Sequence, residues 1–171
     1  AVSDHTKTLL KGRRVIWRDS DCVSIFSSSM SNDKFEVESL FDDGEVAVFS
    51  GSTKQTGTWY ALYPYSDSAI LQSDGRIKTS LPSSQSFTPS SFANGVNLSV
   101  AKSFDNTLHF KNVCALLSFS LSAASINSVK LTSEGTSVSG GIVYIDYHNG
   151  DPTIQIEEAQ NHVELRGDFV V

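Results

Sequence analysis

The sequence predicts an all-β fold, a two-layer antiparallel β-sandwich formed by a single domain. Three observations lead to this prediction. Short apolar runs recur along the chain with Gly, Pro, Asp and Ser between them, which is typical of sandwich and barrel proteins. No window of about a dozen residues keeps apolar side chains at the spacing that an amphipathic helix needs. The chain has 171 residues, the length of one ordinary domain, so we expect residues 1–171 to share one core.

Turn residues set the expected ends of the strands. Asp42-Asp43-Gly44 lies between two apolar runs and predicts a hairpin. Pro64 and Pro82 each end a strand, because proline has no backbone N–H to donate. Residues 83–94 include a further proline and are expected to form a long irregular loop. The expected strands are residues 15–18, 23–26, 35–39, 45–49, 58–63, 77–81, 108–110, 115–121, 126–131, 142–146, 153–156 and 163–171, with a further one near Val96.

Alternation within these strands assigns the buried side chains. Residues 115–121 give the clearest pattern, since alternate side chains of a strand point to opposite faces. Ala115, Leu117, Phe119 and Leu121 are therefore expected on a core face, with mostly hydroxyl side chains on the other face. Further core candidates are Val15, Trp17, Val23, Ile25, Val46, Val48, Ile126, Val129 and Leu131.

Charge and composition exclude several classes of function. Thirteen Lys and Arg against nineteen Asp and Glu give a net charge of −6, so the chain lacks the basic field that binds nucleic acid. Two Cys exclude a zinc site built from three or four thiolates, and each of the four His is isolated, so we expect no metal site. No stretch approaches the ~20 apolar residues of a transmembrane helix.

Catalytic motifs are weak in this sequence. Residues 135–139 (GTSVS) lack the final glycine of a nucleophile elbow. Asp42 and Asp43, with Glu157 and Glu158, leave open a hydrolase that uses paired carboxylates, as a third reading. We expect no catalytic residues, no cofactor and no enzyme activity.

The two cysteines leave one question open. Cys22 and Cys114 have the opposite parity to the core residues of their strands, which is unusual for buried thiols. A disulfide needs Cα atoms within ~7 Å of each other. We favour two free thiols over a disulfide.

A group of aromatic residues is a candidate binding surface. Trp59, Tyr60, Tyr63 and Tyr65 follow one another with imperfect alternation, so some of them are expected to face solvent, a glycan or a protein partner. Core packing is the alternative explanation.

Several sequence clusters, in order, resemble a known family. They are residues 17–26 (WRDSDCVSIF), 59–66 (WYALYPYS), 81–85 (LPSSQ), 99–103 (SVAKS) and 110–119 (FKNVCALLSF). The series resembles the amino-terminal domain of Bacteroidetes fimbrillin-like proteins over nearly the whole chain. The resemblance implies a transthyretin-like β-sandwich, export as a lipoprotein to the cell surface or outer membrane, and assembly into fimbriae by β-strand exchange with other subunits.

The resemblance also implies roles for particular residues. Arg13 and Arg14 form the one basic doublet and are the candidate cut site of an arginine-specific protease. Ser68 follows Asp67 in a short pattern that Bacteroidetes glycosylate, which makes it a candidate O-glycosylation site. The chain stops within an apolar strand, so we expect a second, carboxy-terminal β-domain to be missing. Shaft, tip and anchor roles stay open, and membrane contact is expected only through an upstream lipid anchor.

Two functions follow from the sequence. The first is a structural or adhesive fimbrial component. The second is a secreted or surface-anchored sandwich that binds host or dietary glycans through the aromatics at residues 59–65. Possible partners of the first include host proteins or glycans as receptors.

Overall fold

The computed structural model is built almost entirely from β-strands. It describes residues 9–11, 14–27, 31–54, 57–88, 91–93, 95–121, 126–135, 138–147 and 150–169. Within these residues the one helical element is a 3-10 turn, η1 (Asp42–Gly44). None of them belongs to a helix long and apolar enough to cross a membrane. The all-β prediction is confirmed.

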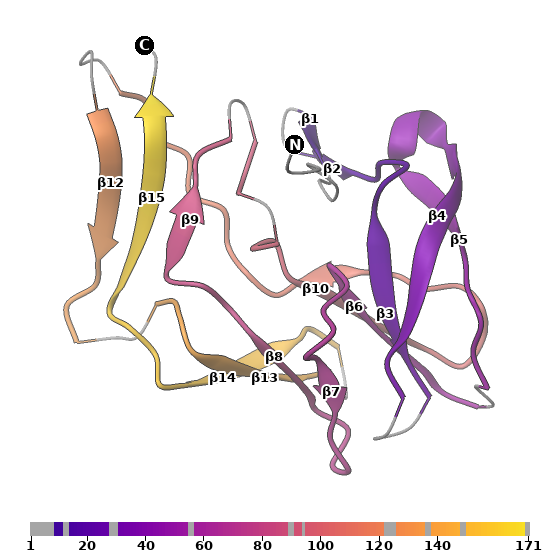
Figure 1. Cartoon of the computed structure of the whole chain (residues 1–171). Helices are drawn as coiled ribbons and strands as arrows, with labels where there is room; N and C mark the ends of the chain where they lie inside the picture. The colour runs from indigo at the N-terminus through magenta and orange to yellow at the C-terminus, as the bar shows by residue number, and fades with distance from the viewer. Residues whose placement is uncertain are drawn as a thin grey trace.

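The strands of the described residues form four sheets, as Figure 1 shows. The largest has six strands in the order β11 (Lys111–Asn112), β10 (Ser99–Ser103), β6 (Trp59–Tyr63), β3 (Cys22–Phe26), β4 (Asp33–Phe41) and β5 (Val46–Ser50). A four-stranded sheet has the order β14 (Thr153–Glu157), β13 (Ile142–Asp146), β8 (Ile77–Ser80) and β7 (Ile70–Leu71). A three-stranded sheet contains β12 (Ile126–Thr132), β15 (His162–Phe169) and β9 (Ser84–Ser86), and β1 (Leu9–Lys11) pairs with β2 (Arg14–Ile16).

Nearly every neighbouring pair of strands is antiparallel. The exception among the described strands is β15 with β9, which run parallel with Glu164 opposite Ser84. In Figure 1 the three-stranded sheet stands on the opposite side of the molecule from β3, β4 and β5. The predicted hairpin at Asp42–Gly44 joins β4 to β5, with Phe41 opposite Val46.

One face of the six-stranded sheet packs against the four-stranded sheet. Phe26, Leu62 and Val100 come from β3, β6 and β10 and are fully buried. They form one cluster with side chains of the four-stranded sheet and of the loops beside it, among them Leu71, Ile77, Val143 and Ile145. Burying each such side chain contributes roughly 1.5–3 kcal/mol, so this shared interior is the main core of the fold.

The opposite face of the six-stranded sheet carries a second, smaller cluster. Val23, Ile25, Ala61, Tyr63 and Ala101 are buried there. They are covered by half-buried side chains rather than by another sheet: Trp17, Phe35, Phe49, Trp59, Leu108 and Phe110. Since β3 is covered on both faces, all five of its residues are buried.

The structure corrects several sequence predictions. Residues 108–110 and 115–121 are outside the strands, and Leu117 and Phe119, which were expected in the core, are 69% and 49% exposed. Val46 and Val48, also expected in the core, are exposed because β5 is the last strand of its sheet and lies beyond the four-stranded sheet's cover. Leu131 is exposed on β12 as well. Strand β9 lies inside the expected irregular loop.

Candidate functional site: an apolar groove on the six-stranded sheet

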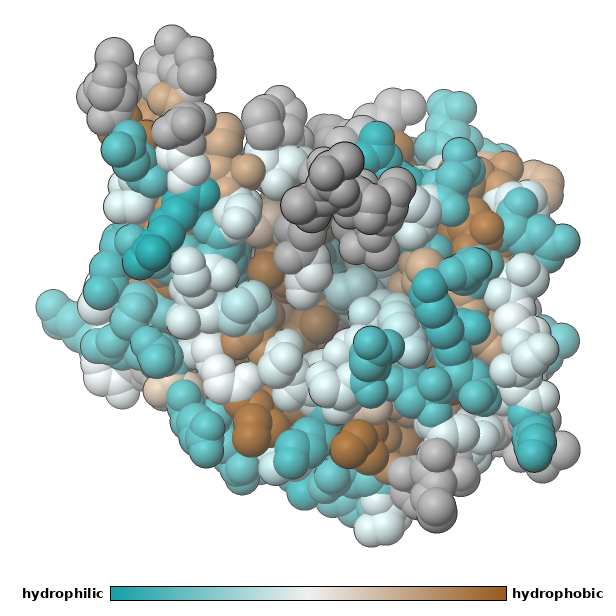
Figure 2. All heavy atoms as spheres, viewed as in Figure 1, coloured by the Kyte–Doolittle hydropathy of each residue, from teal (hydrophilic) through white to brown (hydrophobic). Residues whose placement is uncertain are grey.

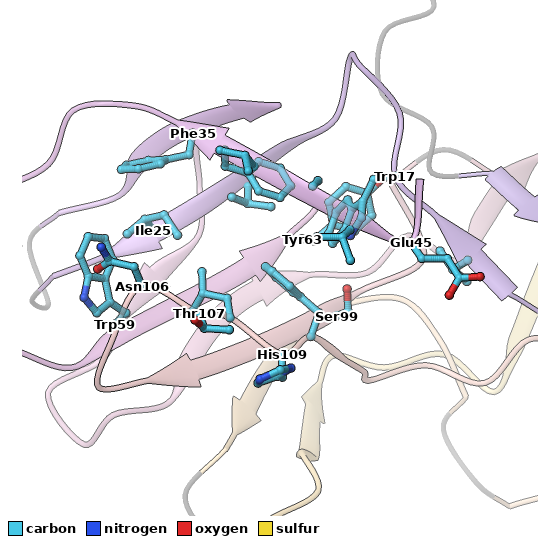
Figure 3. A pocket seen from close by; sticks show the side chains of 18 of the residues that line it. Trp17, Ile25, Phe35, Glu45, Trp59, Tyr63, Ser99, Asn106, Thr107 and His109 are labelled. Atoms are coloured by element: carbon cyan, nitrogen blue, oxygen red, sulfur yellow. The ribbon is translucent and has the colours of Figure 1, made fainter. Parts of the chain in front are cut away.

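A groove with a volume of about 1060 Å³ opens on the second face of the six-stranded sheet. Its floor is the apolar face of β3, β4 and β6, with Ile25, Phe35 and Trp59 among the lining side chains. One wall is residues 45–49, at the outer strand of the sheet. The other wall is residues 106–110, which connect β10 to β11 and pass over the sheet. Figure 3 shows Trp59 and Asn106 at one end and Trp17, Tyr63 and Glu45 at the other.

Trp17 joins the two walls at its end of the groove. Its ring makes edge contacts with Phe49 (5.1 Å between centroids), with Tyr63 (5.1 Å) and with Phe110 (5.3 Å). These rings meet at 72–87°, the edge-to-face arrangement that aromatic quadrupoles prefer. Trp17 therefore fixes the spacing of the walls by packing rather than by hydrogen-bonded sheet structure.

A glycine allows the backbone to come close to Trp17. The N–H of Trp17 donates to the carbonyl oxygen of Gly44 over 2.8 Å, which ties the β4–β5 turn to the groove. A Cβ at Gly44 would lie 2.9 Å from the Trp17 carbonyl oxygen, and its φ of +88° is one that other residues rarely adopt. The turn sequence thus determines the shape of the groove's end as well as the hairpin.

A buried carboxyl supports the floor. Asp21 is fully buried and accepts two hydrogen bonds, from the Arg18 backbone N–H (2.9 Å) and from the Tyr63 hydroxyl (3.0 Å). Burial raises the pKa of the Asp21 carboxyl, and the two hydrogen bonds offset part of this rise. Tyr63 is held between Asp21 and Trp17, so its ring is a rigid part of the floor.

The polar side chains of the groove include one that has no partner. Asn97 is 2% exposed and lines the groove, yet neither its Oδ1 nor its Nδ2 has a hydrogen-bond partner. Buried side-chain amides are normally bonded, because an unpaired buried polar group is costly. The described lining residues contain Glu45 and His109 but no Lys or Arg.

The arrangement does not resemble a metal or hydrolase centre. Within the described residues no group of three or more His, Cys, Asp and Glu side chains could hold a metal ion. The two acidic pairs lie on different sheets, since Asp42 and Asp43 form the turn after β4 while Glu157 and Glu158 lie at the end of β14. The apolar floor, with one phenylalanine in each wall, instead suits an apolar ligand.

The four predicted aromatic contacts lie in three different places. Trp59 and Tyr63 line the groove, but Tyr63 is only 4% exposed. Tyr60 has the opposite parity on β6, and the ammonium of Lys102 lies 5.0 Å from its ring centre. Tyr65 follows the strand and lies 5.7 Å from the Lys34 ammonium. The four rings therefore do not form one row, and their contact with a glycan or partner stays a prediction.

The other predicted sites lie away from the groove or outside the described residues. Arg13 is outside the described residues, and only the backbone of Arg14, at the start of β2, is described. Ser68 is exposed, and its hydroxyl lies 3.1 Å from that of Ser66. Exposure is what a modified serine needs, but the cut site and the glycosylation stay predictions.

Both cysteines are free thiols. Cys22 is buried, contrary to the parity argument, because β3 is covered on both faces. Burial raises the pKa of the Cys22 thiol, and burial does the same for the half-buried Cys114. Cys114 follows β11, and two strands separate β11 from β3, so the sheet keeps the two sulfur atoms apart.

Residues 115–121 are an apolar segment outside the sheets. All of residues 115–120 are exposed, with Leu116 at 44% and Leu117 at 69%. On the face seen in Figure 2, hydrophobic side chains reach the surface at several places between hydrophilic ones. A run of exposed apolar side chains such as this one is a candidate contact surface.

Sequence reasoning missed Asn97 and the wall at residues 106–110. A signal for Asn97 was present, because Val96, Leu98 and Val100 alternate with Asn97, Ser99 and Ala101. The first three face the main core and the others face the groove. The wall had no signal, since residues 108–110 read as a strand. Compared with known proteins, the chain matches no family model, no curated protein and no solved structure.

Proposed function

We propose that this chain is a structural component of a bacterial cell-surface fimbria and assembles by β-strand exchange, without catalysis. Its fold is then a transthyretin-like sandwich, and its partners are other fimbrial subunits. The protein is exported, with membrane contact through an upstream lipid anchor. The resemblance of residues 17–26, 59–66 and 110–119 to fimbrillin-like proteins is the starting point of the proposal.

The observation that carries the proposal is the open groove beside an edge strand. Among the described strands, β5 is the last of its sheet, so its outer backbone N–H and C=O groups pair with none of them and can receive a further strand. The groove beside β5 is lined by apolar and aromatic side chains that an added strand would cover. Strand addition needs these two elements, main-chain pairing for affinity and pockets for alternate side chains.

The test is whether the purified chain forms linear polymers. Donor and acceptor surfaces that differ from each other generate open chains rather than closed dimers. Light scattering over a concentration series should therefore show masses that keep rising, and electron microscopy should show filaments. Treatment with an arginine-specific protease, followed by sequencing of the new terminus, examines Arg13 and Arg14 in the same samples. A chain that stays monomeric in both forms would contradict the proposal.

One observation favours a second candidate, glycan binding. Trp59 and Asn106 both line the groove and lie at the same end of it in Figure 3, so an aromatic ring and a side-chain amide are available to a sugar there. A glycan array would then give signals that Trp59→Ala removes. No signal on the array, together with filaments, leaves assembly as the function.

A further inference from the structure

We propose that the groove accepts residues 115–121 of a second copy of this chain, with the side-chain amide of Asn97 bonding to the backbone of that segment. This inference rests on the proposed function and names the strand that is exchanged. Three observations support it: the exposed segment, the apolar groove, and the unpartnered amide.

The segment has the properties of a strand that lacks its sheet. Residues 115–121 (ALLSFSL) carry no charge and no proline. In an extended conformation, alternate positions would put Leu117 and Phe119 on one face. These two side chains are 69% and 49% exposed. Their exposure to water is costly, and burial in an apolar groove would remove that cost.

The groove matches this segment in polarity and size. Ile25, Phe35 and Trp59 provide an apolar floor, and the lining has no Lys or Arg that a neutral segment would leave unpaired. Its volume of about 1060 Å³ is slightly above the ~300–1,000 Å³ typical of small-molecule pockets.

Asn97 supplies a polar partner at one end of the groove. Its amide has one oxygen that accepts and one nitrogen that donates, and both lack partners although the side chain is 2% exposed. A peptide backbone offers the complement, since each residue has one N–H and one C=O. An incoming strand therefore satisfies both atoms of the amide, which a purely apolar ligand leaves unpaired.

The occupant belongs to a second copy because the described residues leave the groove of their own chain open. Its segment leaves the sheet after β11 and lies exposed while the groove stays open. Each copy thus presents one donor segment and one distinct acceptor groove. Such a contact repeats from copy to copy along a chain.

The experiment measures binding of a fluorescent peptide with the sequence ALLSFSL, carried on identical lysine flanks, to the full chain. A control peptide replaces Leu117 and Phe119 by serine. We expect saturable binding of the first peptide, and an affinity at least about tenfold lower for the control, as for the loss of central interface side chains.

Two matched protein variants locate the binding site. Thr107→Trp fills the groove from its exposed wall, whereas Thr153→Trp adds the same ring to an exposed position of β14 on another sheet. Thr107→Trp should lower the affinity about tenfold and Thr153→Trp should leave it unchanged. Equal binding to both variants, equal binding of both peptides, or no binding would overturn the inference.

Asn97→Leu separates binding from folding. Leucine has the same branching and number of side-chain heavy atoms as asparagine and has no unpaired polar atoms, so the melting temperature should hold or rise while the peptide binds about tenfold more weakly. A fall in melting temperature with unchanged peptide affinity would contradict the role of Asn97. If Leu117→Asp forms filaments as well as the wild type does, residues 115–121 are not the exchanged strand, but the proposed fimbrial function still stands. Peptide binding without any polymer would reject the proposed function alone.

Discussion

The two faces of the six-stranded sheet are made from the same strands but are covered in different ways. Toward the four-stranded sheet, Phe26, Leu62 and Val100 lie in a continuous interior. On the other face, single aromatic side chains from a loop, a turn and an edge strand cover Val23 and Ile25 and leave a groove. The difference shows that burial of a strand on both faces does not require a sheet on both sides. It also shows which face has room for a ligand.

The largest effect is expected when the same change, phenylalanine to alanine, is made on each face of the six-stranded sheet. Phe26→Ala removes a fully buried ring from the covered face and should lower the free energy of unfolding by about 3–5 kcal/mol. Phe110→Ala removes a half-buried ring that contacts Trp17, and should cost about 1–2 kcal/mol. Urea denaturation of the two variants and the wild type gives both values. Equal losses would mean that the groove face is packed as tightly as the main core.

A second experiment concerns the hydrogen bond beneath the groove. Tyr63→Phe keeps the ring between Trp17 and the floor but leaves Asp21 Oδ1 without the donor that now lies 3.0 Å away. We expect a loss of about 1–3 kcal/mol in the free energy of unfolding, since a buried acceptor is left unsatisfied. Calorimetry measures it. An unchanged stability would show that water reaches Asp21 from the groove.

The pH dependence of the free energy of unfolding tests the buried Asp21 carboxyl in a second way. Burial raises the pKa of Asp21 above its ordinary value of 3.8, so the folded state holds this proton to a higher pH than the unfolded state. The stabilisation is complete below that ordinary value and is lost as the pH rises through the raised, folded-state pKa. Asp21→Asn should remove this decline from the curve of unfolding free energy against pH. If both proteins show the same slope above pH ~4, Asp21 is not the group responsible.

The smallest effect on the free energy of unfolding is expected in residues 115–121, the segment proposed to occupy the groove of a second copy. Leu117→Ser changes a side chain that is 69% exposed, so the free energy of unfolding should change by less than about 0.5 kcal/mol. Leu62→Ser, at a fully buried position, is the control and should be strongly destabilising. A large loss of stability in Leu117→Ser would place the segment inside the monomer's core.

Local chemistry made much of the fold predictable. Asp42-Asp43-Gly44 forms its turn where expected, and the strand predicted at 142–146 matches β13 in both bounds. Alternation failed where the environment differs from that of a one-sided sheet. Cys22 is buried despite its parity because β3 has cover on both faces, and residues 115–121 alternate well but pair with none of the described strands. A sequence pattern states what a strand can bury but not whether a partner is present.

The groove was the least predictable part for a related reason. Its floor comes from the predicted strands at 23–26 and 58–63, and these core assignments hold for Val23 and Ile25. Its walls come from segments far apart in the chain, residues 45–49 and 106–110, and the ring of Trp17 contacts both of them. Contacts between such distant segments depend on the order of the strands in the sheet, which the local spacing of residues does not predict.

The parallel pairing of β9 with β15 has a consequence for biosynthesis. Residues 84–86 leave the ribosome long before their partner at residues 164–166 has been made. During that interval β9 has no sheet, and the three-stranded layer can close only when translation reaches the last strand. The six-stranded sheet, by contrast, is complete once residue 112 has emerged. Vectorial synthesis therefore completes every strand that lines the groove before it completes the far layer, although the main core beneath that sheet still awaits Val143 and Ile145 of β13.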